Sequence, residues 1–309
     1  MKNTSQVAVI VGSSGQDGQL LEDHLQSLEY KVITIHRKSM NITDPSSVTK
    51  LISDTMPKEV YFLAAHHHSS EDECTDVGEL FRQSISTNTI ATVNFLDAIA
   101  SRSQASKFFY ASSCLVFPPM ENGLQTEDTL HLPDDAYGIS KAAGMAICKH
   151  YREKKGVFAS VGILYNHESP LRKARYVSKK IALAAARIAK EGGGKFVLGD
   201  VDARVDWGYA RDYVNAMHLI LQTIKPADYV IATGEQHTVG QFAQIAFEHV
   251  GLDYRDYLLV RPQSIPRKNL TRIGDSSRLR LDTGWKPSVS FEELVCLMVD
   301  AEMFRMERV

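Results

Sequence analysis

Short apolar runs alternate with amphipathic segments along the first half of the chain. The amphipathic segments 18–30 and 87–102 repeat apolar residues at helical spacing, whereas the runs between them are rich in β-branched and aromatic residues. Strands that alternate with helices predict a parallel sheet built from right-handed crossovers. We therefore expect an α/β fold with a doubly wound parallel sheet. The expected strands cover residues 7–11, 31–36, 59–65, 107–113, 158–166 and 228–234.

The regular alternation ends near residue 166, after which longer loops and the glycine run 192–194 appear. Residues 228–234 nevertheless return to the pattern of a buried strand, so we expect two interleaved domains. The larger, a dinucleotide-binding domain, is predicted to contain residues 1–165 plus about 205–235. The smaller, a substrate-binding domain, is predicted to contain about 166–204 and 236–309.

Composition narrows the functional class. The 309 residues are 44% hydrophobic and carry a formal net charge of −2, so the chain lacks the basic field of nucleic-acid-binding proteins. Its four cysteines are scattered without a CxxC pair, which suits a reducing compartment. No leader-like segment precedes the first expected strand, and no apolar run reaches the length of a membrane span. We expect a soluble cytoplasmic protein with neither nucleic acid nor membrane as partner.

The segment GSSGQDG places Gly12, Gly15 and Gly18 between the first expected strand and the first expected helix. Glycines in this position let backbone N–H groups approach a pyrophosphate at a helix N-terminus. Three glycines can also form a plain turn. Their place at the first strand–helix junction favours a dinucleotide site.

Arg37 and Lys38 follow the second expected strand, where an open α/β sheet distinguishes the two nicotinamide dinucleotides. An acidic residue there binds a free ribose 2′-hydroxyl, whereas arginine suits a 2′-phosphate. The pair favours NADP(H) over NAD(H) as the cofactor. NAD(H) stays open as the alternative, as does a basic turn that is only solvated.

Tyr137 and Lys141 are four residues apart, which places them on one face of a helix. A lysine cation favours the phenolate, so it is expected to lower the pKa of the tyrosine and let it exchange a proton with a carbinol. Ser112 and Ser113 end the preceding strand, at the edge of the sheet where ligands bind. The combination predicts an oxidoreductase that transfers hydride to or from nicotinamide.

Further stretches extend these motifs along the chain: GSSGQDGQLL (12–21), YNHESP (165–170), and the longer segments 200–217, 228–242 and 274–295. In this order, the motifs resemble those of extended short-chain dehydrogenases/reductases, and the longer stretches resemble more narrowly the GDP-mannose 4,6-dehydratase branch of that family. The resemblance covers nearly the whole chain and implies a Rossmann-type fold, a GDP-linked sugar as substrate, and a homodimer or homotetramer.

The resemblance also implies roles for individual residues. Tyr137 is the expected acid/base, Lys141 its partner and a ribose ligand, and Ser113 a hydrogen-bonding partner of the substrate, with support from Asn88. The expected cofactor-binding residues are Gly12, Gly15, Gln16, Asp17, Gly18, Arg37, Asn41, Ile42, Leu63, Ala64, Ala65, Tyr137, Lys141 and His167. The expected substrate-binding residues are His68, Ser112, Ser113, Asn166, Glu168, Lys180, Leu198, Gly199, Arg204 and Arg261.

One departure from the family pattern changes the expected reaction. The dehydratases carry Thr-Ser-Glu after the fourth strand, and this chain carries Ser113-Cys114-Leu115. The family glutamate removes the C5 proton and protonates the departing C6 hydroxyl, which leucine cannot do. We expect oxidation or reduction at sugar C4 without dehydration. A dehydratase with another base, His68 or Cys114, and a non-catalytic nucleotide-sugar-binding protein are the alternatives.

Other departures affect the expected binding residues. Val205 precedes Asp206 where the family has arginine, so Arg204 is the expected substitute. Leu171-Arg172 replaces an arginine pair, and the family's Arg-Pro-x-Glu motif is half present at Arg261, with Arg267 as a second candidate. The run of three histidines at 66–68 suits a loop beside the site, or equally a solvated loop, better than a metal centre, because consecutive side chains cannot easily converge on one ion. No metal is expected.

Overall fold

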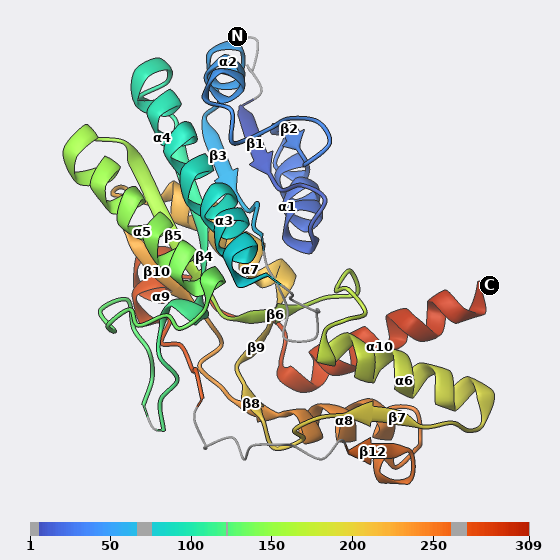
Figure 1. Ribbon diagram of the computed structural model, residues 1–309. Coiled ribbons are helices and arrows are strands. Elements are labelled where there is room, and N and C mark those ends of the chain that lie inside the picture. The colour runs from blue at the N-terminus through green and yellow to red at the C-terminus, as the bar shows by residue number, and fades with distance from the viewer. Residues whose placement is uncertain (1–5, 67–75, 122, 261–270, 309) are drawn as a thin grey trace.

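The computed structural model describes residues 6–66, 76–121, 123–260 and 271–308. Within these ranges the predicted doubly wound α/β fold is confirmed, because six parallel strands form one central sheet (Figure 1). The order across the sheet is β2 (Lys31–Ile35), β1 (Val7–Val11), β3 (Glu59–Phe62), β4 (Lys107–Ser113), β5 (Phe158–Leu164) and β10 (Asp228–Ile231).

The strand order marks one edge of the sheet as a site for ligands. From β1 the chain winds outward to β2 and then crosses back past β1 to β3, so the winding direction reverses between β1 and β3. Ligands of open parallel sheets bind at the carboxyl ends of the strands, beside such a reversal. Here those ends lead into the glycine loop after β1 and to Ser113 at the end of β4.

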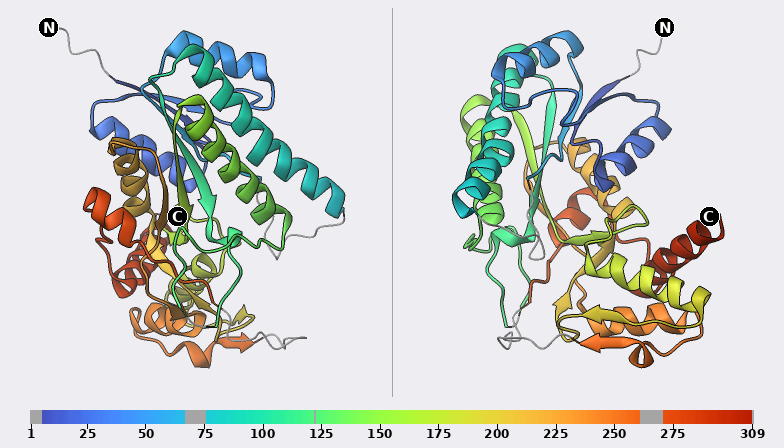
Figure 2. Two further views of the ribbon diagram at one scale, coloured as in Figure 1. Left: turned by 90° about the vertical axis from the view of Figure 1, so that its left-hand side faces the viewer. Right: turned by 45° about the vertical axis from the view of Figure 1, so that its right-hand side comes forward.

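Helices cover both faces of the sheet (Figure 1 and Figure 2). The alternation within β1 explains why, since Ala8 and Ile10 lie in one buried cluster and Val9 and Val11 in another. A strand that is buried on both faces has a continuous apolar sequence. One face carries α1 (Gln16–Ser27) and α7 (Ala210–Gln222), and the other carries α2 (Pro45–Thr55), α3 (Val77–Ile85), α4 (Ala91–Arg102) and α5 (Ala136–Lys155).

A smaller lobe lies beyond the carboxyl ends of the strands (Figure 1), with a hydrophobic cluster of its own. Its helices α6, α8 and α10 pack against one another. The helices are α6 (Val177–Glu191), α8 (Val239–Glu248) and α10 (Phe291–Glu307), and α9 (Ser277–Thr283) packs on α7 instead. The short strand pairs are β6 (Asn166–Glu168) with β9 (Trp207–Tyr209), β7 (Phe196–Leu198) with β12 (Leu258–Val260), and β8 (Arg204–Val205) with β11 (His237–Thr238).

The two lobes interleave along the chain, but two segments pack across the predicted boundaries. Trp207, inside the predicted sheet domain, belongs to the hydrophobic cluster of the smaller lobe. Leu279 and Trp285, inside the predicted smaller domain, belong to the cluster under α1 and α7. Among the described residues, none of the helices is both long and apolar enough to cross a membrane.

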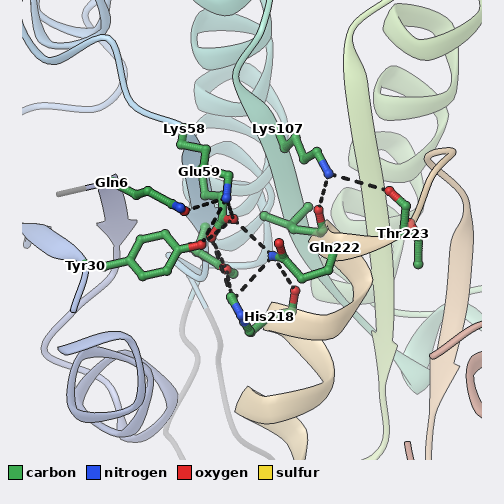
Figure 3. Close-up of polar contacts among 10 residues, drawn as sticks. Gln6, Tyr30, Lys58, Glu59, Lys107, His218, Gln222 and Thr223 are labelled. Atoms are coloured by element: carbon green, nitrogen blue, oxygen red, sulfur yellow. Dashed lines mark hydrogen bonds and ion pairs between the residues drawn. The ribbon is translucent and has the colours of Figure 1, made fainter. Parts of the chain in front are cut away.

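A buried carboxylate lies at the amino ends of the strands, opposite the edge of the sheet where ligands bind. Glu59 begins β3 and is fully buried (Figure 3). Its oxygens accept hydrogen bonds from the hydroxyls of Tyr30 (2.9 Å) and Tyr61 (2.7 Å) and from Gln222 Nε2 (3.0 Å). Burial favours the neutral acid, but hydrogen bonding, first from His218 and then from Gln222, outweighs it and lowers the pKa of Glu59 to about 2. The charged carboxylate therefore joins β3 to α7 and to the start of β2.

Glu59→Gln is expected to destabilise the fold by about 2 kcal/mol, the usual worth of hydrogen bonds to a charged group. A carboxyl whose folded pKa lies below its ordinary value contributes stability above that ordinary value, and this is lost as the pH falls toward about 2. Urea unfolding at neutral and acid pH measures both effects. Asp54→Asn, which breaks the exposed Lys50–Asp54 ion pair, is the matched control and should change little. Equal stability of the Glu59 variant and the parent at neutral pH would contradict this account.

Candidate active site

The three glycines of the loop after β1 meet different surroundings. Gly12 has a φ of 98°, and a Cβ there would lie 2.6 Å from the backbone nitrogen of Ala64. A Cβ on Gly18 would lie 2.6 Å from the carbonyl oxygen of Gly12, so both positions require glycine for packing alone. A Cβ on Gly15 would meet only that oxygen, at 3.4 Å. Gly15 therefore leaves open space at the N-terminus of α1, as close approach of a pyrophosphate needs.

A cavity of about 720 Å³ begins at this loop and has the size of a small-molecule site. It extends along the ends of β2 and β3. Eleven of the residues predicted to bind the cofactor line it: Gly12, Gly15, Gln16, Asp17, Gly18, Arg37, Asn41, Ile42, Leu63, Ala64 and Ala65. The open glycine position, the cavity and the cation at Arg37 together suit a nicotinamide dinucleotide.

The cavity has further cationic residues that the sequence motifs did not assign to the cofactor. Arg172, Lys173 and Arg175 line it together with Tyr176. The Arg172 guanidinium lies 3.6 Å from the centre of the Tyr176 ring. In the sequence these residues form the basic stretch LRKAR directly after YNHESP. The sequence alone does not show that this stretch lies beside the glycine loop; the fold brings the two together.

The predicted catalytic pair lies on the first turns of α5. Asp135 begins this helix by accepting the N–H of Gly138 (2.6 Å). Lys141 is buried, donates from Nζ to the carbonyl oxygen of Ala111 (2.7 Å), and lies 5.6 Å from the centre of the Tyr137 ring. The structure thus brings Tyr137 and Lys141 together, although neither lines the cavity.

Ser113 ends β4 beside the same helix. Its hydroxyl oxygen accepts the N–H of Leu115 (3.2 Å), which starts a 3₁₀ turn at Cys114–Val116. A Cβ on Gly138 would lie only 2.6 Å from the carbonyl oxygen of Leu115. The turn that follows Ser113 therefore packs directly on the first turn of α5, next to Tyr137.

Burial controls the ionisation of this pair. It raises the pKa of the Tyr137 phenol above its ordinary value, and it lowers the pKa of the Lys141 ammonium to about 7. The predicted lowering of the tyrosine pKa was wrong for this structure, because desolvation of the buried phenol is the largest effect on its pKa and raises it. Tyr137 is therefore held as the neutral phenol, ready to donate a proton.

Asn88 supports the pair from a π-helical turn at Ser86–Ile90, between α3 and α4. Its amide nitrogen donates to Ser140 Oγ (2.9 Å), and its amide oxygen accepts the N–H of His66 (3.0 Å). The hydroxyl of Tyr110 donates to its backbone carbonyl oxygen (2.8 Å). Asn88 therefore joins the chain leaving β3 to the helix that carries Tyr137. π-helical turns of this kind are frequent at functional sites.

The sequence motifs GQDG and NHES contact each other. His167 Nε2 lies 3.0 Å from both carboxylate oxygens of Asp17, and Ser169 Oγ donates to Gln16 Oε1 (2.8 Å). Burial opposes charge on Asp17 and His167, but their mutual attraction outweighs it. It lowers the pKa of the aspartate and raises that of the histidine. His167 does not line the cavity.

The predicted substrate-binding residues are more dispersed. Ser112 is buried, and its hydroxyl has no hydrogen-bond partner within the described part of the chain. Glu168 is buried and bonded to Ser178 (2.7 Å) and Arg172 (3.0 Å), whereas the side chain of Leu198 belongs to the hydrophobic cluster of the smaller lobe. Asn166, Gly199 and Arg204 are exposed, and Lys180 is half-buried on α6. His68, Arg261 and Arg267 lie outside the described residues.

Over the described ranges, no group of three or more His, Cys, Asp or Glu side chains is placed to hold a metal ion. Of the three consecutive histidines, only His66 is described, and it lines the cavity.

Known proteins resemble this chain over nearly its full length. Two curated relatives are GDP-mannose 4,6 dehydratase 2 of Arabidopsis thaliana, 35% identical over 96% of this chain and 87% of the relative, and the human GDP-mannose 4,6 dehydratase, 31% identical over 96% and 91%. Among solved structures, RMD from Pseudomonas aeruginosa, complexed with NADPH, superposes with a TM-score of 0.83 at 21% identity, over 97% of this chain and all of that one. The dTDP-glucose 4,6-dehydratase of Bacillus anthracis, in complex with NAD, gives 0.82 at 18%, over 98% of both.

At these identities the solved structures show the fold alone. The family model for GDP-mannose 4,6 dehydratase matches residues 38–298, which include Ser113, Tyr137, Lys141 and the NHESP segment. The family recognised from the sequence motifs is thereby confirmed: the chain belongs to the GDP-mannose 4,6-dehydratase family.

Proposed function

We propose that this protein oxidises or reduces a GDP-linked sugar at C4 with NADP(H) and does not carry out the C5/C6 dehydration. Family membership supports a nucleotide-sugar enzyme that uses NAD(P)(H). A C4 reaction without dehydration is supported by the pairing of Tyr137 and Lys141 beside a turn in which Leu115 takes the place of the dehydratase glutamate.

Proton transfer at C4 falls to residues of this chain. A bound nicotinamide ring supplies the hydride chemistry. In reduction the neutral phenol of Tyr137 donates its proton to the C4 oxygen, and in oxidation the phenolate of Tyr137 takes the proton of the C4 hydroxyl. Lys141 is fixed by the Ala111 carbonyl oxygen under the tyrosine ring, and Ser113 lies at the strand end where its hydroxyl can bond the same oxygen. The retained set argues against a non-catalytic binding protein.

Neither of the two residues that follow Ser113 is suited to replace the dehydratase glutamate as a base. Leu115 has no proton to exchange, and burial raises the pKa of the neighbouring Cys114 thiol to about 11. A thiol with that pKa is almost entirely protonated at neutral pH and cannot accept the C5 proton efficiently. Cys114 also lies in the hydrophobic cluster that faces α5. The alternative that uses His68 concerns a residue outside the described part.

The proposal is tested by net turnover with a panel of GDP-sugars. A C4 oxidoreductase produces one reduced cofactor for each sugar oxidised, because nothing within the reaction consumes it again. Absorbance of the reduced cofactor and the mass of the nucleotide-sugar product are measured in the same sample. Product formation without any net change in the cofactor would contradict the proposal.

Arg37→Asp is expected to reverse or abolish the preference for NADP(H) over NAD(H). Arg37 lines the cavity at the end of β2, and a charge-assisted bond to a 2′-phosphate is worth about 1.5–3 kcal/mol, or about 10- to 100-fold in affinity. Titration with both cofactors measures the ratio. Lys38→Asp, which makes the same charge change one residue later and does not line the cavity, is the matched control. Equal affinity of the parent for both cofactors would remove this assignment.

Association into a homodimer or homotetramer in the cytoplasm is part of the proposal. It is supported by apolar side chains that remain exposed along the helices of one face of the sheet. Val77 begins α3, Ile90 ends the π-helical turn, and Ile139 lies on α5. These three elements pack against one another, and exposed apolar side chains on neighbouring helices suit contact with a second subunit.

A further inference from the structure

Asp17 and His167 form a buried contact between the cofactor loop and the strand that enters the smaller lobe. Asp17 lies in the first turn of α1 and lines the cavity, and His167 is the central residue of β6. His167 Nε2 faces both oxygens of the aspartate at 3.0 Å, and Nδ1 faces the carbonyl oxygen of Tyr165 at 2.7 Å. Because both ring nitrogens face acceptors, both must donate, which only the imidazolium can do.

Both ring nitrogens of His167 and one face of its ring are occupied by protein groups. One face stacks on Tyr213 of α7, with 4.5 Å between the ring centres. The histidine is therefore held on its edges by Asp17 and Tyr165 and on one face by Tyr213. Because its ring nitrogens are occupied and it does not line the cavity, we assign His167 a positioning role.

The contact continues into the smaller lobe through the next residue. Glu168 is buried, accepts the hydroxyl of Ser178 on α6 (2.7 Å), and pairs with Arg172 (3.0 Å). Arg172 lies on the ring of Tyr176, and both line the cavity. The contacts divide at Glu168: Arg172 returns to the cavity beside Tyr176, whereas Ser178 leads into α6 of the smaller lobe.

We propose that the Asp17–His167 ion pair couples the two ligand sites, so that occupation of the cofactor cavity fixes β6 and tightens binding of the nucleotide-sugar, and the reverse. The inference rests on the proposed function, because it takes β6 and α6 to belong to the sugar-nucleotide site. Displacement of Asp17 by a ligand at the glycine loop moves His167 with it, since a buried ion pair is costly to separate. Coupling of this kind is reciprocal and typically amounts to about 5- to 150-fold in affinity.

The test measures binding by calorimetry in the full-length protein. The affinity for GDP-mannose is determined alone and with saturating NADPH, a pair that cannot react by C4 oxidation. The affinity for NADPH is determined alone and with saturating GDP-mannose. The coupling ratio in the parent is expected to lie well above 1, and to be the same in both directions.

Asp17→Asn and His167→Gln each remove the ion pair and are expected to bring the ratio close to 1. The double variant should lose no more coupling than either single variant, because the two residues act as one unit. Asp300→Asn is the matched control: it breaks an exposed Asp–His contact of 2.6 Å with His249 in the smaller lobe and should leave the ratio unchanged. A residue with only a structural role would weaken both affinities and leave their ratio intact.

The pH dependence of the ratio in the unmodified protein is a second readout that needs no variant. The groups that face the imidazole are Asp17 from α1, Arg172 from the following loop and Tyr213 from α7. The pKa of His167 lies above its ordinary value, so the pair is charged at low pH and loses its charge as the pH rises through the raised pKa. The coupling ratio is expected to fall over that interval.

The outcomes separate the inference from the function on which it rests. Binding of both ligands with a ratio of 1, or a ratio that survives in Asp17→Asn and does not change with pH, overturns the coupling and leaves the proposed function intact. Failure of the parent to bind NADPH, or to bind any GDP-sugar of the panel, overturns both.

Discussion

Tyr137→Phe is expected to lower the rate of hydride transfer by about 10²–10⁴-fold, the usual contribution of a general acid or base. The substitution removes the transferable proton and keeps the ring that packs over Lys141. Because the tyrosine does not line the cavity, the affinity for the cofactor should remain within about a factor of a few. Single-turnover measurement of cofactor oxidation or reduction isolates this step from product release.

The same chain offers a matched control for this variant. Tyr151 lies on α5 as well, and its hydroxyl donates to Asp97 (2.5 Å), away from the carboxyl edge of the sheet. Tyr151→Phe makes an identical chemical change on the same helix and should leave hydride transfer unaltered. Equal rates for Tyr137→Phe and the parent would show that another group moves the proton.

The fold could be predicted because its signals are local. The runs VAVIV and KFFYASS became β1 and β4 with the predicted bounds, since strands buried on both faces need apolar β-formers without interruption. The glycine loop could be placed for a similar reason. A positive φ at Gly12 and the close contact at Gly18 admit no other residue, and both follow from a strand turning directly into a helix.

The parts of the site that could not be predicted from the sequence depend on contacts between residues far apart in the chain. Asp17 and His167 are 150 positions apart, and no periodicity relates them; only the packing of β6 against the start of α1 makes them a pair. Arg172 and Tyr176 reached the cavity in the same way. The ionisation of Tyr137 was predicted in the wrong direction because spacing reveals the neighbouring cation but not the depth of burial, and burial is the larger effect here.

Incubation of the parent with NADP⁺ and GDP-mannose or a related GDP-sugar in deuterated water is expected to give a 4-keto product that retains its C6 hydroxyl, with one NADPH formed for each sugar oxidised. Oxidation at C4 acidifies the C5 proton, but elimination still needs a base for that proton and an acid for the departing hydroxyl. Leu115 supplies neither, and the thiol of Cys114 stays protonated. Loss of one water from the product, measured by mass, with deuterium at C5 measured by NMR, would show that a different residue acts as the base and that the protein is a dehydratase.

Leu115→Glu is the converse test and carries the largest expected gain of function. The side chain at this position is partly exposed, so a carboxylate would not be forced into the hydrophobic cluster. The turn itself depends on backbone contacts, the N–H of Leu115 with Ser113 Oγ and its carbonyl oxygen against Gly138, which the substitution leaves in place. Leu115→Gln has nearly the shape of the glutamate variant but cannot exchange a proton, so it separates shape from chemistry. Since general acid–base catalysis is worth about 10²–10⁴-fold, water loss should appear in the glutamate variant and stay absent from the glutamine variant. Equal water loss in the two would mean that the absence of a carboxylate at this position is not what stops the reaction at C4.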